Sequence, residues 1–196
     1  MFYDSRVGQY RGDDGRFVSR EKVLAVVDGE AIGLGVKLQR HVKRAINGEI
    51  TAIDLAEAMS QDLKLYSIQM AGMARGGIKK ITMADYGKIG QVQAERNRRL
   101  RGFVDALLNG DITEKQALAR ARQYAGTIKQ VHSMIEHEEM GKFYRYARRV
   151  LNPLAAHCDQ CIVYQRLEWT PIDQIVPVGV RCDCRQNCEC TIVYRN

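Results

Sequence analysis

Apolar residues recur every three to four positions through most of residues 20–150, which is the spacing of one face of an α-helix. The first such stretch follows Ser19, a residue suited to cap a helix, and Asn47-Gly48 has the chemistry to end it. Its apolar positions are Val27, Ala31, Leu34, Leu38, Val42 and Ala45. Glycine weakens a helix by roughly 1 kcal/mol relative to alanine. We therefore expect this helix to kink, or to be approached closely by another backbone, at Gly29, Gly33 and Gly35.

A short sequence occurs twice in this region, as INGEIT at 46–51 and as LNGDIT at 108–113. In each copy the Asn-Gly pair suits the end of one helix, and the threonine, Thr51 or Thr113, suits the start of the next. Thr113 is followed by Gln116, which completes a capping box. The repeat therefore predicts two similar helical hairpins that pack together.

The second hairpin shows the clearer signals. Thr82 and Asp85 have capping-box spacing, so we expect a helix from there to about Leu108. Residues 71–82 predict a glycine-rich, basic loop between the hairpins, and a last helix is expected around 138–150. The helix that begins after Thr113 has its apolar residues close to a heptad seam, at Leu118, Ala121, Ala125, Ile128 and Ile135.

The two ends of the chain differ from this helical pattern. Residues 1–19 form a polar arm in which Asp13-Asp14-Gly15 favours a turn. We interpret the arm as a strap that packs on the helices; the alternative is an arm that reaches a neighbouring subunit. The whole pattern predicts a mainly α fold, with antiparallel helical hairpins over 20–150 and a small Cys-rich α+β module over 151–196.

All six cysteines of the chain lie in this last module, in HCDQC at 157–161 and CDCRQNCEC at 182–190. Two cysteines separated by two residues can both point at one tetrahedral ion, and a second cluster about 20 residues later completes a structural zinc pattern. Cys182 is then a spare thiol, and His157 is an alternative nitrogen ligand. The predicted ligands are Cys158, Cys161, Cys184, Cys188 and Cys190.

Disulfides, free thiols or an iron–sulfur cluster remain alternatives to zinc. Six cysteines allow about 15 disulfide pairings, so the sequence does not select one. A catalytic zinc ion is disfavoured because abundant thiolates close its coordination sphere. A bound metal or a disulfide would stabilise this module, because a module of about 46 residues has too small a hydrophobic core to be stable alone.

The composition is that of a globular chain, with 45% hydrophobic residues and a formal net charge of +7. No run of residues is long and apolar enough for a membrane span, and the N-terminus lacks the apolar core of a secretory signal. We therefore expect a protein made in a reducing cytosol, without membrane contact. The positive charge favours non-specific contact with a polyanion such as DNA.

Two basic segments, ERNRRLR at 95–101 and FYRYARR at 143–149, are candidate surfaces for DNA phosphates or for a partner protein. The ordinary alternative is a solvated helix face, or ion pairs with a partner subunit. The candidate contact residues are Arg96, Arg99, Arg145, Arg148 and Arg149.

No enzymatic motif emerges, so we expect a protein without catalytic turnover. HSMIEHEEM at 132–140 lacks the HExxH spacing of a zinc protease and is interpreted as a polar helix face whose groups have partners. GGIKK at 76–80 lacks the spacing and the Ser/Thr of a phosphate-binding P-loop.

The C-terminal motif, HC-x2-C followed by WTPI and then NCECTIVYR, resembles that of the phage minor head proteins, the Mu protein F-like or head morphogenesis family. Cys158 and Cys161 match the first cysteine pair of that motif, and Cys188 and Cys190 match the second. The resemblance implies a virion protein made in the host cytoplasm and located near the portal, which assists head assembly, DNA packaging or head–tail connection. Its implied partners are the portal, other virion proteins and its own copies. The alternative from another class is a zinc-containing DNA-binding or regulatory protein.

Overall fold

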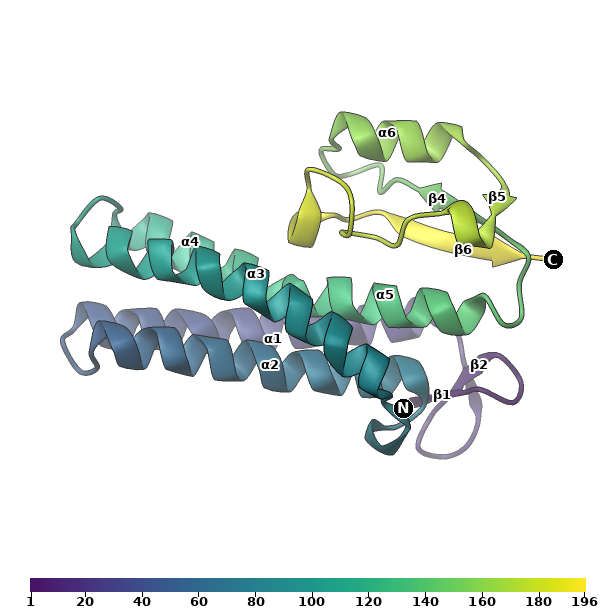
Figure 1. The fold of residues 1–196 in the computed structure, drawn as a ribbon, viewed down its shortest axis with the longest axis horizontal. Coiled ribbons are helices and arrows are strands. Elements are labelled where there is room, and N and C mark those ends of the chain that lie inside the picture. The colour runs from purple at the N-terminus through teal and green to yellow at the C-terminus, as the bar shows by residue number, and fades with distance from the viewer.

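The computed structural model describes residues 1–196 as a mainly helical protein with two small three-stranded antiparallel sheets (Figure 1). The helices are α1 (Arg20–Ile46), α2 (Ala52–Arg75), α3 (Met83–Leu108), α4 (Glu114–Ala125), α5 (Thr127–Met140) and α6 (Asp159–Arg166), with short 3₁₀ turns η1 (Ile78–Lys80), η2 (Ile172–Gln174) and η3 (Arg185–Asn187). The strands are β1 (Phe2–Asp4), β2 (Gln9–Arg11), β3 (Phe17–Val18), β4 (Tyr146–Val150), β5 (Thr170–Pro171) and β6 (Thr191–Arg195). The predicted fold class, mainly α with a small α+β module, is confirmed.

The local signals at the helix ends are also confirmed. Ser19 caps α1, and its side chain accepts a hydrogen bond from the backbone N–H of Lys22. The threonines at 51, 82 and 113 each form a complete capping box with the residue three positions later. Both glycines of the repeat adopt the same left-handed backbone, with φ of 73° at Gly48 and at Gly110. The two copies of the repeat therefore form the same turn between consecutive helices.

Helix α1 remains continuous across its three glycines. At Gly35 a β-carbon would lie 3.2 Å from Cγ of Arg122, so α4 approaches α1 closely at this point. Gly29 and Gly33 face open space. Of these three glycines, the expected close approach is confirmed at Gly35 alone.

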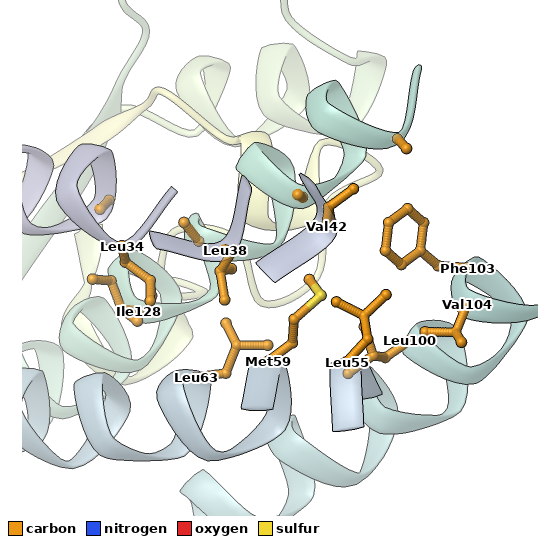
Figure 2. Packing of buried hydrophobic residues seen from close by; sticks show 14 of the residues in the cluster. Leu34, Leu38, Val42, Leu55, Met59, Leu63, Leu100, Phe103, Val104 and Ile128 are labelled. Carbon is orange, nitrogen blue, oxygen red and sulfur yellow. The ribbon is translucent and has the colours of Figure 1, made fainter. Parts of the chain in front are cut away.

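The main hydrophobic core lies between α1, α2, α3, α4 and the start of α5. Figure 2 shows Met59 and Leu63 of α2 directed toward Leu38 of α1, with Phe103 of α3 closing one end of the cluster. Burying one side chain of this size stabilises the fold by roughly 1.5–3 kcal/mol relative to leaving it exposed. This core makes the helices a rigid base for the C-terminal module.

Three sequence predictions were wrong in their boundaries. The helix expected after Thr113 is divided at Gly126 into α4 and α5. The loop expected at 71–82 begins only after Arg75, because α2 continues to that residue. The helix expected around 138–150 ends at Met140, and residues 146–150 form strand β4.

Strand β4 explains the last of these errors. Its residues YARRV alternate between exposed and buried positions, with Ala147 and Arg149 inside. It pairs antiparallel with β6 over its whole length, in a register that places Ala147 opposite Tyr194 and Arg149 opposite Ile192. This strand is central in the C-terminal sheet, whose order is β5-β4-β6.

The N-terminal strands pack on the helices, as the strap interpretation expected. Tyr3 and Tyr10 are buried with Val23 of α1 and Met140 of α5. The rings of Tyr3 and Tyr10 make an edge-to-face contact with centroids 5.2 Å apart. The strap therefore closes the end of the bundle at which α5 leads into the C-terminal module (Figure 1).

The C-terminal module lies along α5, and polar contacts join the two (Figure 1). The backbone N–H of Val178 donates to the hydroxyl of Ser133 over 3.0 Å, and a ring nitrogen of His137 donates to the carbonyl of Ile172 over 3.0 Å. At the other end of α5 the carbonyl of Gln186 lies against Gly126, where a β-carbon would be only 2.3 Å from that oxygen. The break between α4 and α5 thus coincides with a docking point for η3.

Substituting Gly126 with alanine is expected to destabilise the protein by about 1–2 kcal/mol, because the new methyl group overlaps the backbone of η3 and displaces it. The matched control is Gly102→Ala in α3, where a β-carbon meets nothing within 4 Å. That control should instead gain about 0.5–1 kcal/mol from helix propensity. Urea unfolding of both variants measures the difference, and equal stabilities would contradict the proposed docking point.

Candidate metal centre

The six cysteines converge on one buried cluster in the C-terminal module. Cys158 caps the N-terminus of α6 and Cys161 lies in its first turn, which turns both side chains to one side. The other four cysteines lie at 182, 184, 188 and 190, on the segment that surrounds η3 and leads into β6. All six thiols are free. The cluster thus joins two segments more than 20 residues apart in the sequence.

Two groups of three sulfur atoms have the separations expected of metal ligands. Cys158, Cys161 and Cys184 lie within 4.8 Å of one another, and so do Cys161, Cys182 and Cys188. The Sγ of Cys161 is 4.0 Å from that of Cys184 and 3.6 Å from that of Cys188. Such distances exceed the bond length of a disulfide, which is about 2.05 Å. The structure therefore contains a possible metal-binding cluster of free thiols.

The predicted ligands Cys158, Cys161, Cys184 and Cys188 all belong to these two groups. Cys182 was expected to be spare, but it belongs to the second group and is 5% exposed. The sequence missed it because the spacing of the last four cysteines does not indicate which of them point inward.

Cys190 lies at the edge of the same cluster, with its Sγ 3.8 Å from Nδ1 of His157. The Nε2–H of His157 donates to the carbonyl of Asn152 over 2.7 Å, so Nδ1 is the acceptor that faces the thiol. His157 is therefore beside the sulfur cluster, as an alternative nitrogen ligand has to be.

The thiols influence one another strongly. Hydrogen bonding from Cys190 lowers the pKa of Cys188 to about 4, and burial opposes this effect. Burial also raises the pKa of Cys158, but hydrogen bonds from the backbone around Cys161 and Cys184 outweigh it and hold that pKa at about 7. Burial raises the pKa of Cys161 well above its ordinary value. The cluster thus favours thiolate at particular positions, and thiolate is the form that binds metals.

Arg149 of β4 places a positive charge inside this cluster. Its side chain is only 1% exposed, and its Nη1 lies 3.9 Å from the Sγ of Cys161 and 3.8 Å from the Sγ of Cys188. Its Nη2 donates to the carbonyls of Val176 and Pro177, and its Nε has no partner. A buried guanidinium is costly unless an anion lies nearby. The guanidinium also lies 4.6 Å from the ring centroid of Tyr164, and the nearby groups that can carry a negative charge beside it include the sulfurs of Cys161 and Cys188.

This position of Arg149 overturns its assignment as a surface contact. Arg96, another predicted contact, is also 1% exposed and donates to Gln130 and Gln186 over 2.9 and 2.7 Å. Both side chains are buried, so neither is exposed at the surface as that prediction requires, and both bind groups of the interior instead. Arg96 in particular fastens η3 to α3 and α5.

The remaining three predicted contacts lie at the surface. Arg99 pairs with Glu95 over 2.7 Å on the same helix. Arg145 and Arg148 are exposed, and the guanidinium of Arg148 lies 5.1 Å from the ring centroid of Trp169. Their contact with DNA or with a partner stays a prediction.

Neither the family models, nor the curated proteins, nor the solved structures contain a match to this chain. None of its helices combines the length and the apolar character required to cross a bilayer.

Proposed function

We propose that the chain is a structural protein of a tailed-phage virion, located near the portal, where it assists head assembly, DNA packaging or head–tail connection. The C-terminal module would serve as a docking element, made rigid by thiolate-bound zinc and carried on a helical base. In this proposal zinc is a structural ion, and the chain performs no catalysis.

One observation supports this proposal most directly. The cysteine pairs that carry the resemblance to the minor head proteins, Cys158 with Cys161 and Cys188 with Cys190, meet in a single buried cluster although about 30 residues separate them. The four cysteines of the motif therefore belong to one site. The convergence is what a structural metal site requires, because its ligands order the segments that carry them.

Purified virions of the phage that encodes this chain provide the test. Mass spectrometry of the particles is expected to detect the chain in a few copies, and a tagged chain is expected to co-purify with the recombinant portal ring. Absence from the particles, together with failure to bind the portal, would contradict the virion role.

The alternative role as a DNA-binding zinc protein rests on the net charge of +7 and on the exposed Arg145 and Arg148. It predicts that the isolated chain binds bare DNA with an affinity that falls steeply as salt increases. The virion role predicts portal binding that persists after nuclease treatment.

A further inference from the structure

The two groups of sulfur ligands contain more cysteines than one ion can bind. Together they include five different residues, Cys158, Cys161, Cys182, Cys184 and Cys188, and they share only Cys161. A structural zinc ion takes four ligands in a tetrahedron. A single ion at the first group would leave the buried thiols of Cys182 and Cys188 without a metal, and one at the second group would leave the partly buried thiols of Cys158 and Cys184.

We propose that the cluster binds two zinc ions through six thiolates, with Cys161 as a ligand shared by both ions. This inference rests on the zinc in the proposed function and is independent of the virion role. Cys158 and Cys184 are ligands of the first ion only, and Cys182 is a ligand of the second ion only. Cys188 belongs to the second group, with its Sγ 3.6 Å from that of Cys161. In the loaded centre it would move toward Cys158 and Cys184 to become the second shared ligand, and Cys190 of the same cluster would supply the sixth thiolate.

The sulfur separations agree with this arrangement. Zinc–sulfur bonds of about 2.3 Å in a tetrahedron place two sulfurs on one ion roughly 3.8 Å apart. The distances from Cys161 to Cys184 and to Cys188, 4.0 and 3.6 Å, lie on either side of this value. Cys161 is therefore at ligand distance from a member of each group at the same time, which is the position of a bridging thiolate.

The buried charge of Arg149 is an independent argument for the same centre. Two divalent ions with six thiolates carry a formal net charge of about −2, so the centre needs a nearby cation. Arg149 places its Nη1 within 3.9 Å of both Cys161 and Cys188, which are the two proposed shared ligands. Its Nε has no hydrogen-bond partner, and one face of the guanidinium lies over the ring of Tyr164. The guanidinium thus faces the part of the cluster where shared thiolates concentrate negative charge.

The number of zinc ions per chain tests the proposal directly. The full chain, purified with zinc and under reducing conditions, is expected to show two ions in native mass spectrometry and in elemental analysis. None of the six thiols should then react with an alkylating reagent until the protein is denatured. One ion per chain with two reactive thiols would overturn the shared centre, and disulfides or bound iron would overturn the zinc as well. Two ions in a chain that is absent from virions would keep the centre and reject the virion role.

Two variants separate the ions. Cys158→Ser and Cys182→Ser each remove a ligand that belongs to one group only, so each is expected to retain one tightly bound ion under competition with a chelator. Loss of both ions in both variants, or of neither, would overturn the assignment.

The neighbouring arginines of β4 form a matched pair for the charge argument. Arg149→Met keeps a long side chain but removes the cation, and it is expected to weaken zinc binding about 10- to 100-fold, as loss of a group that supports metal ligands does. Arg148→Met removes an exposed charge from the same strand and should leave zinc affinity unchanged. Equal affinities in the two variants would show that Arg149 does not compensate the charge of the centre.

Discussion

Cys161→Ser is expected to release bound zinc and to unfold the C-terminal module while most of the helical structure remains. Cys161 is fully buried and is the only cysteine common to both ligand groups, so its loss disrupts both at once. The module has only a small hydrophobic core of its own, because its separate hydrophobic cluster contains only Ala147, Ile175 and Ile192 as buried members. A core of this size is marginal without a metal or a covalent link.

The chain offers a convenient probe for this experiment. Its only tryptophan, Trp169, lies in the module, where the guanidinium groups of Arg148 and Arg195 are 5.1 and 4.2 Å from the ring centroid. Tryptophan emission should therefore change to that of a solvated ring, whereas far-UV circular dichroism should fall only slightly. The control is Val163→Ser on the exposed side of α6, which should retain both signals and the metal.

A loss of all helical signal in Cys161→Ser would show that the module and the bundle unfold as one unit. The contacts along α5 could couple the two parts in this way, since Gln186 of the module lies against Gly126 and accepts a hydrogen bond from Arg96. Retention of zinc and of native emission would contradict the role of Cys161 altogether.

The parts of the fold that the sequence predicted correctly depend on neighbouring residues. A threonine cap and its partner three positions later lie within one turn, so the starts of α2, α3 and α4 are visible in a short window. The same holds for the Asn-Gly ends at Gly48 and Gly110. The convergence of the two cysteine segments was predictable for a related reason, since the spacing of thiols within each segment reports a shared ligand site.

The parts that the sequence could not predict depend on distant residues. Residues 146–150 become a strand because β6 pairs with them from more than 40 positions away, although their composition also suits a helix. The same pairing turns Arg149 inward, toward sulfurs that belong to other segments. The break at Gly126 depends on the backbone of Gln186. One clue was available, since YARRV can be read with a period of two as well as with a helical period.

The HSMIEHEEM segment was interpreted as a polar helix face whose groups have partners; the structure confirms the partners and shows that some of them form a buried ionic network. Glu136 is 1% exposed, and its two carboxylate oxygens accept hydrogen bonds from Nε and Nη2 of Arg20 over 2.9 and 2.6 Å. The hydroxyl of Tyr10 donates to the same carboxylate over 3.1 Å. Arg20 also donates to the carbonyl of Ile192 in β6 over 2.5 Å. Glu136 thus joins the N-terminal strap, α1 and the C-terminal sheet at one point of α5.

Glu136→Gln is expected to lower the free energy of unfolding by about 3 kcal/mol at neutral pH, because it leaves the partly buried charge of Arg20 without its counter-ion. Glu49→Gln is the matched control. Glu49 pairs with Arg44 over 3.5 Å with both side chains about half exposed, so its loss should cost less than about 1 kcal/mol. Urea unfolding followed by circular dichroism measures both changes, and an equal cost for the two variants would contradict the network.

The pH dependence of this difference separates the ionic network from simple packing. Burial acts to raise the pKa of Glu136, but Arg20 lowers it more strongly, so the folded pKa lies below that of the unfolded chain. A carboxyl group with a lowered pKa stabilises the fold fully above its unfolded pKa, about 4.3 for glutamate, and loses that contribution as pH falls through the folded pKa. The stability gap between wild type and Glu136→Gln should therefore be constant above about pH 5 and close progressively in acid. If the difference in free energy of unfolding between wild type and Glu136→Gln stays constant down to acid pH, the negative charge of Glu136 is not its source. The substitution would then act through packing or hydrogen-bond geometry, and the ionic network would be contradicted.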